Sequence, residues 1–186
     1  MKAILLDVPQ SLLDARHRLG HDRSDEMWDG VLHMVPPASG EHQERGSALI
    51  AILRTLAKRV GLQATYETGL FERGRDDNYR VPDNVVSRPE HRPSRGVEGR
   101  AELVVEFRSP NDESYEKLPF YALLDVEEVV ILDGSSIDLR CLVEGSYEPV
   151  LPDDAGWFHL TCVPLALRSA NDGLIEARSN TGTELL

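Results

Sequence analysis

The chain has little cysteine, no long hydrophobic run and a shortage of basic residues. Its 186 residues include only Cys141 and Cys162, too few for a disulfide framework and without metal-site spacing, so we expect core thiols. No apolar run approaches the ~20 residues that span a membrane. Asp7 interrupts the apolar start of the chain, and no signal-peptide cleavage site follows it. These absences predict a cytoplasmic protein that has no membrane partner.

The charge balance is acidic. Lys and Arg number 20 against 32 Asp and Glu, which gives a net charge of -12. This excess argues against a generic nucleic-acid binder, because phosphate contacts require clustered Lys and Arg. A local basic site stays open, because residues 88–100 carry four arginines and two glutamates in a stretch rich in Pro and Gly. The alternative for this surface loop is scattered, solvated charge.

Length and patterning predict one domain of mixed structure. We expect a single domain over residues 1–168, followed by a polar, flexible tail over residues 169–186. Residues 41–60 have helical periodicity, with Ser39 as a possible cap, and Asp29-Gly30 between alternating apolar residues predicts a hairpin. The fold class is therefore α/β (α+β mixed), with one mixed sheet flanked by helices. Further elements are expected as a helix over 11–18, a helix that follows Ser109-Pro110 and ends near 124, and strands over 62–72, 82–86, 102–107, 129–132, 137–143 and 147–150.

Two carboxylates in apolar surroundings are the most informative residues. Asp83 lies just before an apolar strand, and Glu106 lies inside the apolar run 103–107. A carboxylate is costly to bury there unless it is paired or binds a cation. Because side chains alternate along a strand, every second residue of this run shares one face of the sheet. These residues are Glu102, Val104, Glu106 and Arg108.

Two carboxylates and a lysine are the minimal parts for holding Mg²⁺ or Mn²⁺ and for activating water against a phosphodiester. Lys117 follows Glu106 by eleven residues and can stabilise charge in the transition state. Arg108 cannot act as a general base, since its pKa exceeds ~12, but it can neutralise phosphate charge.

Each of these residues also has a purely structural alternative. Asp83 could cap a turn, and Glu106 could form a buried ion pair with Arg108 or Lys117. Lys117 could instead bond to Glu113, which lies four residues earlier on a helix surface.

Several short segments resemble, in order and spacing, the Uma2 family, also called DUF820. The resemblance covers about residues 26–150. The segments are Asp29-Gly30-x-Leu32, Pro36-Pro37-x-Ser39-x-Glu41-His42-Gln43, Val81-Pro82-Asp83-x-Val85-Val86, Leu103-Val104-Val105-Glu106-Phe107-x-Ser109-Pro110, Glu116-Lys117-x-x-x-Tyr121 and Val126-x-Glu128-Val129-Val130-Ile131-Leu132-Asp133.

Uma2 proteins look like members of the PD-(D/E)XK nuclease superfamily. The resemblance implies a restriction-endonuclease-like fold, with Asp83 as the aspartate of the PD half and Glu106 as the second acidic residue. The superfamily pattern places a lysine at position 108, where this chain has arginine. In Uma2 sequences the lysine stands on the following helix, which here corresponds to Lys117.

The resemblance also selects residues at the start of the long helix. Glu41, His42 or Glu44 could complete a metal shell there, and Glu41 and His42 match the Glu-His-Gln segment of the family. We therefore expect Glu41 as a third metal ligand and His42 as support. The alternatives are a helix-dipole role for Glu41 and Glu44 and a plain surface position for His42.

The expected function is a metal-dependent DNA endonuclease in which Asp83, Glu106 and Lys117 are catalytic and Arg108 contacts phosphate. One alternative is a catalytically inactive nuclease fold that serves as a binding or assembly module, which the acidic charge and Arg108 favour. Another is a nuclease that acts on RNA or on a small phosphoester. A homodimer is expected by analogy with nucleases that cut two strands with two subunits.

Overall fold

The computed structural model describes residues 8–109 and 113–186. These residues form three α-helices and three β-sheets, so the α/β class with mixed sheets flanked by helices is confirmed. The expectation of a single sheet is wrong. The expected strand over 62–72 is split at Glu67, whose φ of 44° turns the chain, and its two halves join different sheets. The helices are α1 (Gln10–Leu19), α2 (Gly40–Arg59) and α3 (Leu118–Leu123).

The central sheet has six strands in the order β11-β10-β9-β8-β6-β3. The pair β8 and β9 is parallel, with α3 in the connection between them, and the other neighbours are antiparallel. Of the helix expected after Ser109-Pro110, residues 110–112 lie outside the described residues, residues 114–117 form turns instead of helix, and α3 begins only at Leu118. The strands are β3 (Gln63–Tyr66), β6 (Asn84–Ser87), β8 (Leu103–Phe107), β9 (Glu128–Asp133), β10 (Ser136–Val143) and β11 (Ser146–Pro149).

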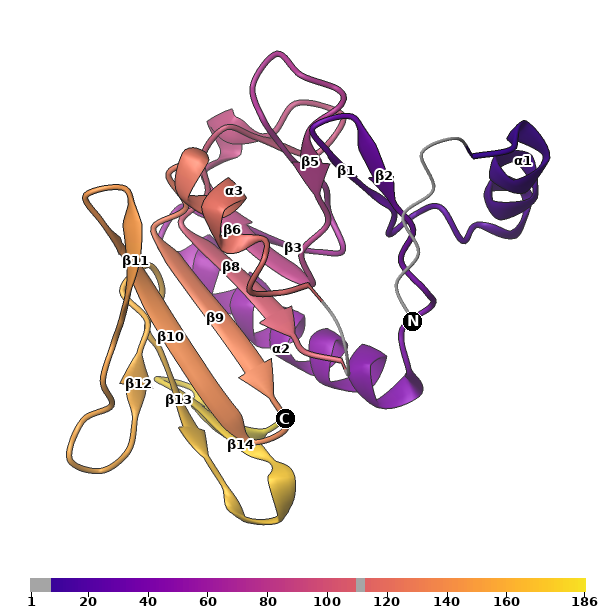
Figure 1. Cartoon of the computed structure of the whole chain (residues 1–186). Helices are drawn as coiled ribbons and strands as arrows, with labels where there is room; N and C mark the ends of the chain where they lie inside the picture. Colours follow the sequence, from indigo (N-terminus) through magenta and orange to yellow (C-terminus); the bar gives the residue numbers. More distant parts are fainter. Residues whose placement is uncertain (1–7, 110–112) are drawn as a thin grey trace.

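The two faces of the central sheet are covered by different helices (Figure 1). Leu103, Val105 and Phe107 pack in the cluster that contains α2, whereas Val104 packs in the cluster that contains α3. The alternation predicted for residues 103–107 is therefore confirmed. Glu106 consequently faces the side of α3, where its charge must find partners.

A second sheet of five short strands lies beside the central one, in the order β2-β1-β5-β4-β7. Its hairpin turns at Asp29 and Gly30, which have φ values of 48° and 84°, so the predicted hairpin is confirmed. This sheet places Glu26, the first residue of β1, close to α3. The strands are β1 (Glu26–Trp28), β2 (Val31–His33), β4 (Leu70–Phe71), β5 (Tyr79–Arg80) and β7 (Val97–Glu98).

The segment 169–186 is not the flexible tail that its polar composition predicts. It contributes to a four-stranded antiparallel sheet, and Ile175, Ala177 and Leu186 are buried in the core cluster of α2. In the sequence, the alternating apolar residues Ile175 and Ala177 give too weak a strand signal against the polar composition of this segment. The strands are β12 (Phe158–His159), β13 (Leu165–Ser169), β14 (Ile175–Ser179) and β15 (Gly182–Leu185).

The first helix lies apart from the rest of the described chain (Figure 1). None of the α1 residues is buried, and Arg16 ties the helix to the chain through Asp25 and the carbonyl of Val35. Cys141 and Cys162 are free and half-buried. No described helix is long and apolar enough to cross a membrane.

Candidate active site

The sheet register brings Asp83 beside Glu106. Strands β6 and β8 pair Asn84 with Val105 and Val85 with Val104, so the next step of the register sets Asp83 opposite Glu106. The Phe107 amide donates to Asp83 Oδ2 at 2.7 Å, which continues the ladder with a side chain. The two predicted carboxylates therefore lie side by side, where β6 begins and β8 ends.

Lys117 reaches the same point from the start of α3. Its Nζ lies 3.1 Å from Glu106 Oε1 and 2.9 Å from Glu26 Oε1. Glu113, its structural alternative partner, instead bonds to His33 at 2.9 Å. The structure thus brings Asp83, Glu106 and Lys117 together, and it also realises the buried Glu106–Lys117 ion pair.

Two residues of this group were missed by sequence reasoning. Glu26 is 2% exposed, and besides Lys117 it accepts from the Val81 amide and from Trp28 Nε1, each at 2.9 Å. Tyr121 is buried, and its hydroxyl donates to Glu106 Oε1. Tyr121 stands in the Glu-Lys-x-x-x-Tyr segment, which was the available signal. Glu26 opens a three-residue strand and had none.

His42 supports Asp83. Its Nε2 lies 2.7 Å from Asp83 Oδ1, and Ser39 caps α2 by accepting from the His42 amide at 3.2 Å, as predicted. The hydrogen bond to Asp83, assisted by the charge of Glu106, raises the pKa of His42. The bond from His42 thus holds Asp83 in place.

Glu41 is exposed at the first turn of α2. Over residues 8–109 and 113–186, no group of three or more His, Cys, Asp or Glu side chains is arranged to hold a metal ion. The role of Glu41 as a third ligand beside Asp83 and Glu106 therefore stays a prediction.

Arg108 lies at the rim of the group. Its Nη1 is 2.7 Å from Asp133 Oδ2, and its guanidinium lies 5.3 Å from the centre of the Tyr115 ring. It shares the predicted face with Glu106, but the described contacts of Glu106 are with Lys117 and Tyr121.

Burial controls the charge of the central pair. Burial, together with the charges of Asp83 and Glu26, raises the pKa of Glu106 to about 7 against the opposing effect of Lys117. Burial also disfavours the Lys117 cation, but Glu106 and Glu26 outweigh it and raise the pKa of Lys117 above its ordinary value. Lys117 is therefore a fixed positive charge and cannot serve as a general base.

The donor set fits a hard divalent cation. Asp83 and Glu106 are the two adjacent carboxylates, and Glu26, which bonds to Lys117, adds a third negative charge nearby. Lys117 and Tyr121 both bond to Glu106 Oε1. Among the described residues, no donor bonds to Glu106 Oε2. Carboxylate oxygens are the ligands that Mg²⁺ and Mn²⁺ prefer.

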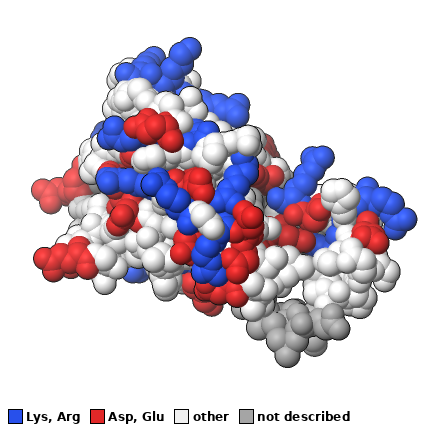
Figure 2. Space-filling view, turned by 90° about the horizontal axis from the view of Figure 1, so that it is seen from above, with Lys and Arg blue, Asp and Glu red and all other residues white. Residues whose placement is uncertain are grey.

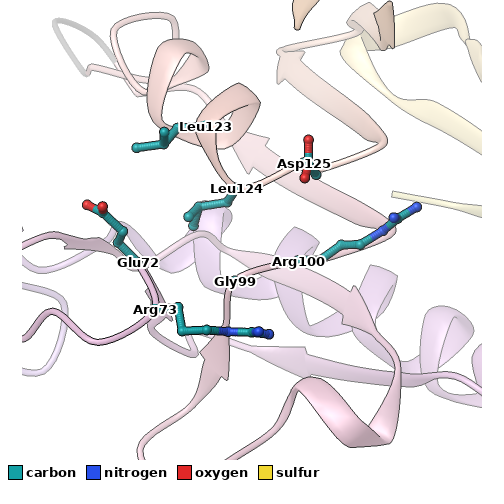
Figure 3. Close-up of a pocket in the computed structure, with 7 residues that line it drawn as sticks. All are labelled: Glu72, Arg73, Gly99, Arg100, Leu123, Leu124 and Asp125. Atoms are coloured by element: carbon teal, nitrogen blue, oxygen red, sulfur yellow. The ribbon is translucent and has the colours of Figure 1, made fainter.

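A cavity of about 340 Å³ lies elsewhere (Figure 3). Arg100 precedes β8 and Glu106 stands near its end, so the cavity lies at the opposite end of this strand from the carboxylates. Its two arginines are balanced by two carboxylates. The lining residues are Glu72, Arg73, Gly99, Arg100, Leu123, Leu124 and Asp125.

The arginines of the loop 88–100 are engaged within the protein. Basic and acidic side chains alternate over the face seen in Figure 2. The loop therefore differs from a continuous basic patch. The bonds run from Arg88 to Glu102, from Arg92 to the Ser87 hydroxyl, from Arg95 to Asp76 and Glu98, and from Arg100 to Glu127.

The family model Uma2, described as "Putative restriction endonuclease", matches residues 12–168. The chain belongs to the Uma2 family. This confirms the family expected from the motifs around Asp83, Glu106 and Lys117. Uma2 membership and the fold indicate a restriction-endonuclease-like nuclease, a hydrolase of phosphodiester bonds.

Among solved structures, a protein described as "a putative nuclease belonging to DUF820" from Anabaena variabilis ATCC 29413 is similar to this Uma2 chain. The TM-score is 0.56 at 15% identity, over 67% of this chain and 75% of that one, a likeness that concerns the fold. A DrdV–DNA complex aligns with a TM-score of 0.36 at 16% identity, over 56% of this chain and 9% of that one, which supports no conclusion. No curated protein matches the chain.

Proposed function

We propose that this Uma2 protein is a DNA endonuclease that depends on Mg²⁺ or Mn²⁺. The observation that carries the proposal is the pairing of Asp83 with Glu106 across β6 and β8, with Lys117 Nζ 3.1 Å from Glu106. Two adjacent carboxylates beside a fixed cation suit phosphodiester hydrolysis, in which negative charge grows on the phosphoryl oxygens.

In this proposal Asp83 and Glu106 hold the metal ion. The bound ion polarises the phosphoryl oxygen and lowers the pKa of water. His42 orients Asp83, and Tyr121 and Lys117 orient Glu106, through the bonds described above. The Lys117 ammonium also offers charge to the transition state.

In this proposal, Arg108 at the edge of the carboxylate group contacts the substrate. Arg108, which stacks near Tyr115, lies two residues beyond Glu106 and is positioned to meet a phosphate of the DNA backbone. A homodimer that acts in the cytoplasm and cuts both strands completes the proposal, by analogy with restriction endonucleases.

The test is cleavage of a supercoiled plasmid with Mg²⁺ or Mn²⁺. Asp83→Asn and Glu106→Gln should each lower the rate by at least about 100-fold. Glu102→Gln is the matched control, because Glu102 is a buried glutamate on the same face of the strand and bonds to Arg88 instead. Wild-type rates in Asp83→Asn, measured with folded protein, would show that the assignment is wrong.

A second candidate is a nuclease fold that binds a partner without turnover. It is favoured by the absence of a three-ligand metal group among the described residues and by the double pairing of Lys117. It predicts no cleavage of DNA, RNA or a small phosphodiester by folded wild-type protein. Cleavage of RNA or the small ester alone would instead identify the substrate class.

A further inference from the structure

Lys117 is shared by two carboxylates that belong to different parts of the site. Glu106 is a member of the proposed metal pair, whereas Glu26 comes from β1 in the second sheet. The Lys117 side chain is only 13% exposed, so water compensates little of its charge. Its position therefore depends on how firmly each carboxylate holds it.

The two carboxylates differ in what else they must bind. A divalent ion on Glu106 competes with the Lys117 ammonium for the same charge and also repels it. Glu26 is fixed independently of Glu106, because it accepts from the Val81 amide and from Trp28 Nε1. Glu26 can thus keep its bond to Lys117 while Glu106 changes partner.

A buried arginine links the strand that carries Glu26 to the helix that follows Lys117. The Arg80 guanidinium lies between the Trp28 ring, at 4.0 Å, and the Phe120 ring, at 4.2 Å. Trp28 belongs to the strand that carries Glu26, and Phe120 belongs to the helix that follows Lys117. This stack joins the two elements on either side of the Glu26–Lys117 bond.

We infer that Glu26 is a positioning residue, which retains Lys117 beside the site when a divalent cation takes Glu106. This inference rests on the proposed function and deepens it. Without Glu26 the ammonium would have Glu106 as its single close carboxylate among the described residues, and a metal ion bound to Glu106 would leave a buried cation unpaired. Loss of Glu26 should therefore weaken metal binding even though Glu26 is not a ligand.

The experiment is calorimetric titration of Mn²⁺ into four proteins at about pH 8, above the Glu106 pKa of about 7. They are the wild type, Glu26→Gln, Lys117→Met and the double variant. Glu26→Gln should weaken Mn²⁺ binding by about tenfold, and Lys117→Met should tighten it. In the Lys117→Met background, Glu26→Gln should change the affinity by only about twofold, the residual long-range attraction of a carboxylate.

Glu102→Gln is the control for loss of a buried carboxylate that does not touch Lys117, and its affinity should match the wild type. Thermal unfolding verifies that each variant is folded, and Lys117→Gln replaces Lys117→Met if the latter is not. An equal loss from Glu26→Gln in both backgrounds overturns the inference, because Glu26 would then attract the metal directly. Unchanged affinity in Glu26→Gln overturns it as well, while wild-type binding leaves the proposed function intact. Absence of saturable binding in the wild type overturns both.

Discussion

At the residue scale, Glu106 shows how one carboxylate can be buried in an apolar strand. It lies on the face of β8 toward α3, where Lys117 and Tyr121 bond to the same oxygen. Burial, together with the negative charges of Asp83 and Glu26 nearby, raises the pKa of the group above that of an exposed glutamate. Its environment suits a ligand that supplies further positive charge.

This environment makes the stability of the metal-free protein depend on pH. The pKa of Glu106 rises from 4.5 in an ordinary environment to about 7, so its favourable contribution is complete below about 4.5 and is lost as the pH rises through about 7. Glu106→Gln imitates the protonated form and keeps that contribution. Relative to the wild type, the variant should gain on the order of 2 to 3 kcal/mol between about pH 5 and pH 8.

Urea unfolding of both proteins across this range measures the difference, with EDTA present to exclude metal. Parallel stability curves for the wild type and Glu106→Gln would mean that the carboxyl titrates normally.

At the scale of the element, the long and regular segments were predictable and the short ones were not. The helix over 41–60 and its Ser39 cap, the hairpin at Asp29-Gly30 and the strands of β9 to β11 carry local signals of periodicity, capping or turn chemistry. Strands β4, β5 and β7 have two residues each, and their pairing depends on neighbours that are distant in sequence.

One glycine is required where β7 meets β4. Gly96 has a φ of 147°, and a Cβ there would lie 2.4 Å from the carbonyl oxygen of Gly69. Gly96→Ala should therefore lower the free energy of unfolding by at least about 2 kcal/mol. Gly74→Ala, at a φ of 75° with no atom within 4 Å of the added Cβ, is the control and should cost about 1 kcal/mol.

Chemical denaturation of the two variants provides the comparison. Equal losses at the two positions would show that backbone conformation, rather than the close approach to Gly69, sets the cost.

At the scale of the whole molecule, the C-terminal sheet completes the core on the side of α2. Residues from β13 and β14 share one apolar cluster with Leu49 and Leu53 of α2 and with Val105 of β8. The six-stranded sheet that aligns Asp83 with Glu106 is thus supported by α2 and by the C-terminal strands, which are distant in sequence.

The packing of β14 predicts a large effect from one truncation. Ile175 is 0% exposed in this core, so Ile175→Ala should lower the free energy of unfolding by about 2 to 5 kcal/mol. Its neighbour Leu174 is 38% exposed, and Leu174→Ala should change stability by less than about 1 kcal/mol. Urea titration distinguishes the two, and a negligible loss in Ile175→Ala would support the tail predicted from composition.

The sequence by itself determined the α/β class, the Uma2 family and the face of the strand on which Glu106 lies. These depend on periodicity and on short motifs, which are local. Tertiary structure alone decided that Glu26 meets Lys117, that Tyr121 bonds to Glu106 and that Arg108 pairs with Asp133. The physical reason is that a strand's period fixes which way a side chain points, whereas its partners come from the packing of distant segments.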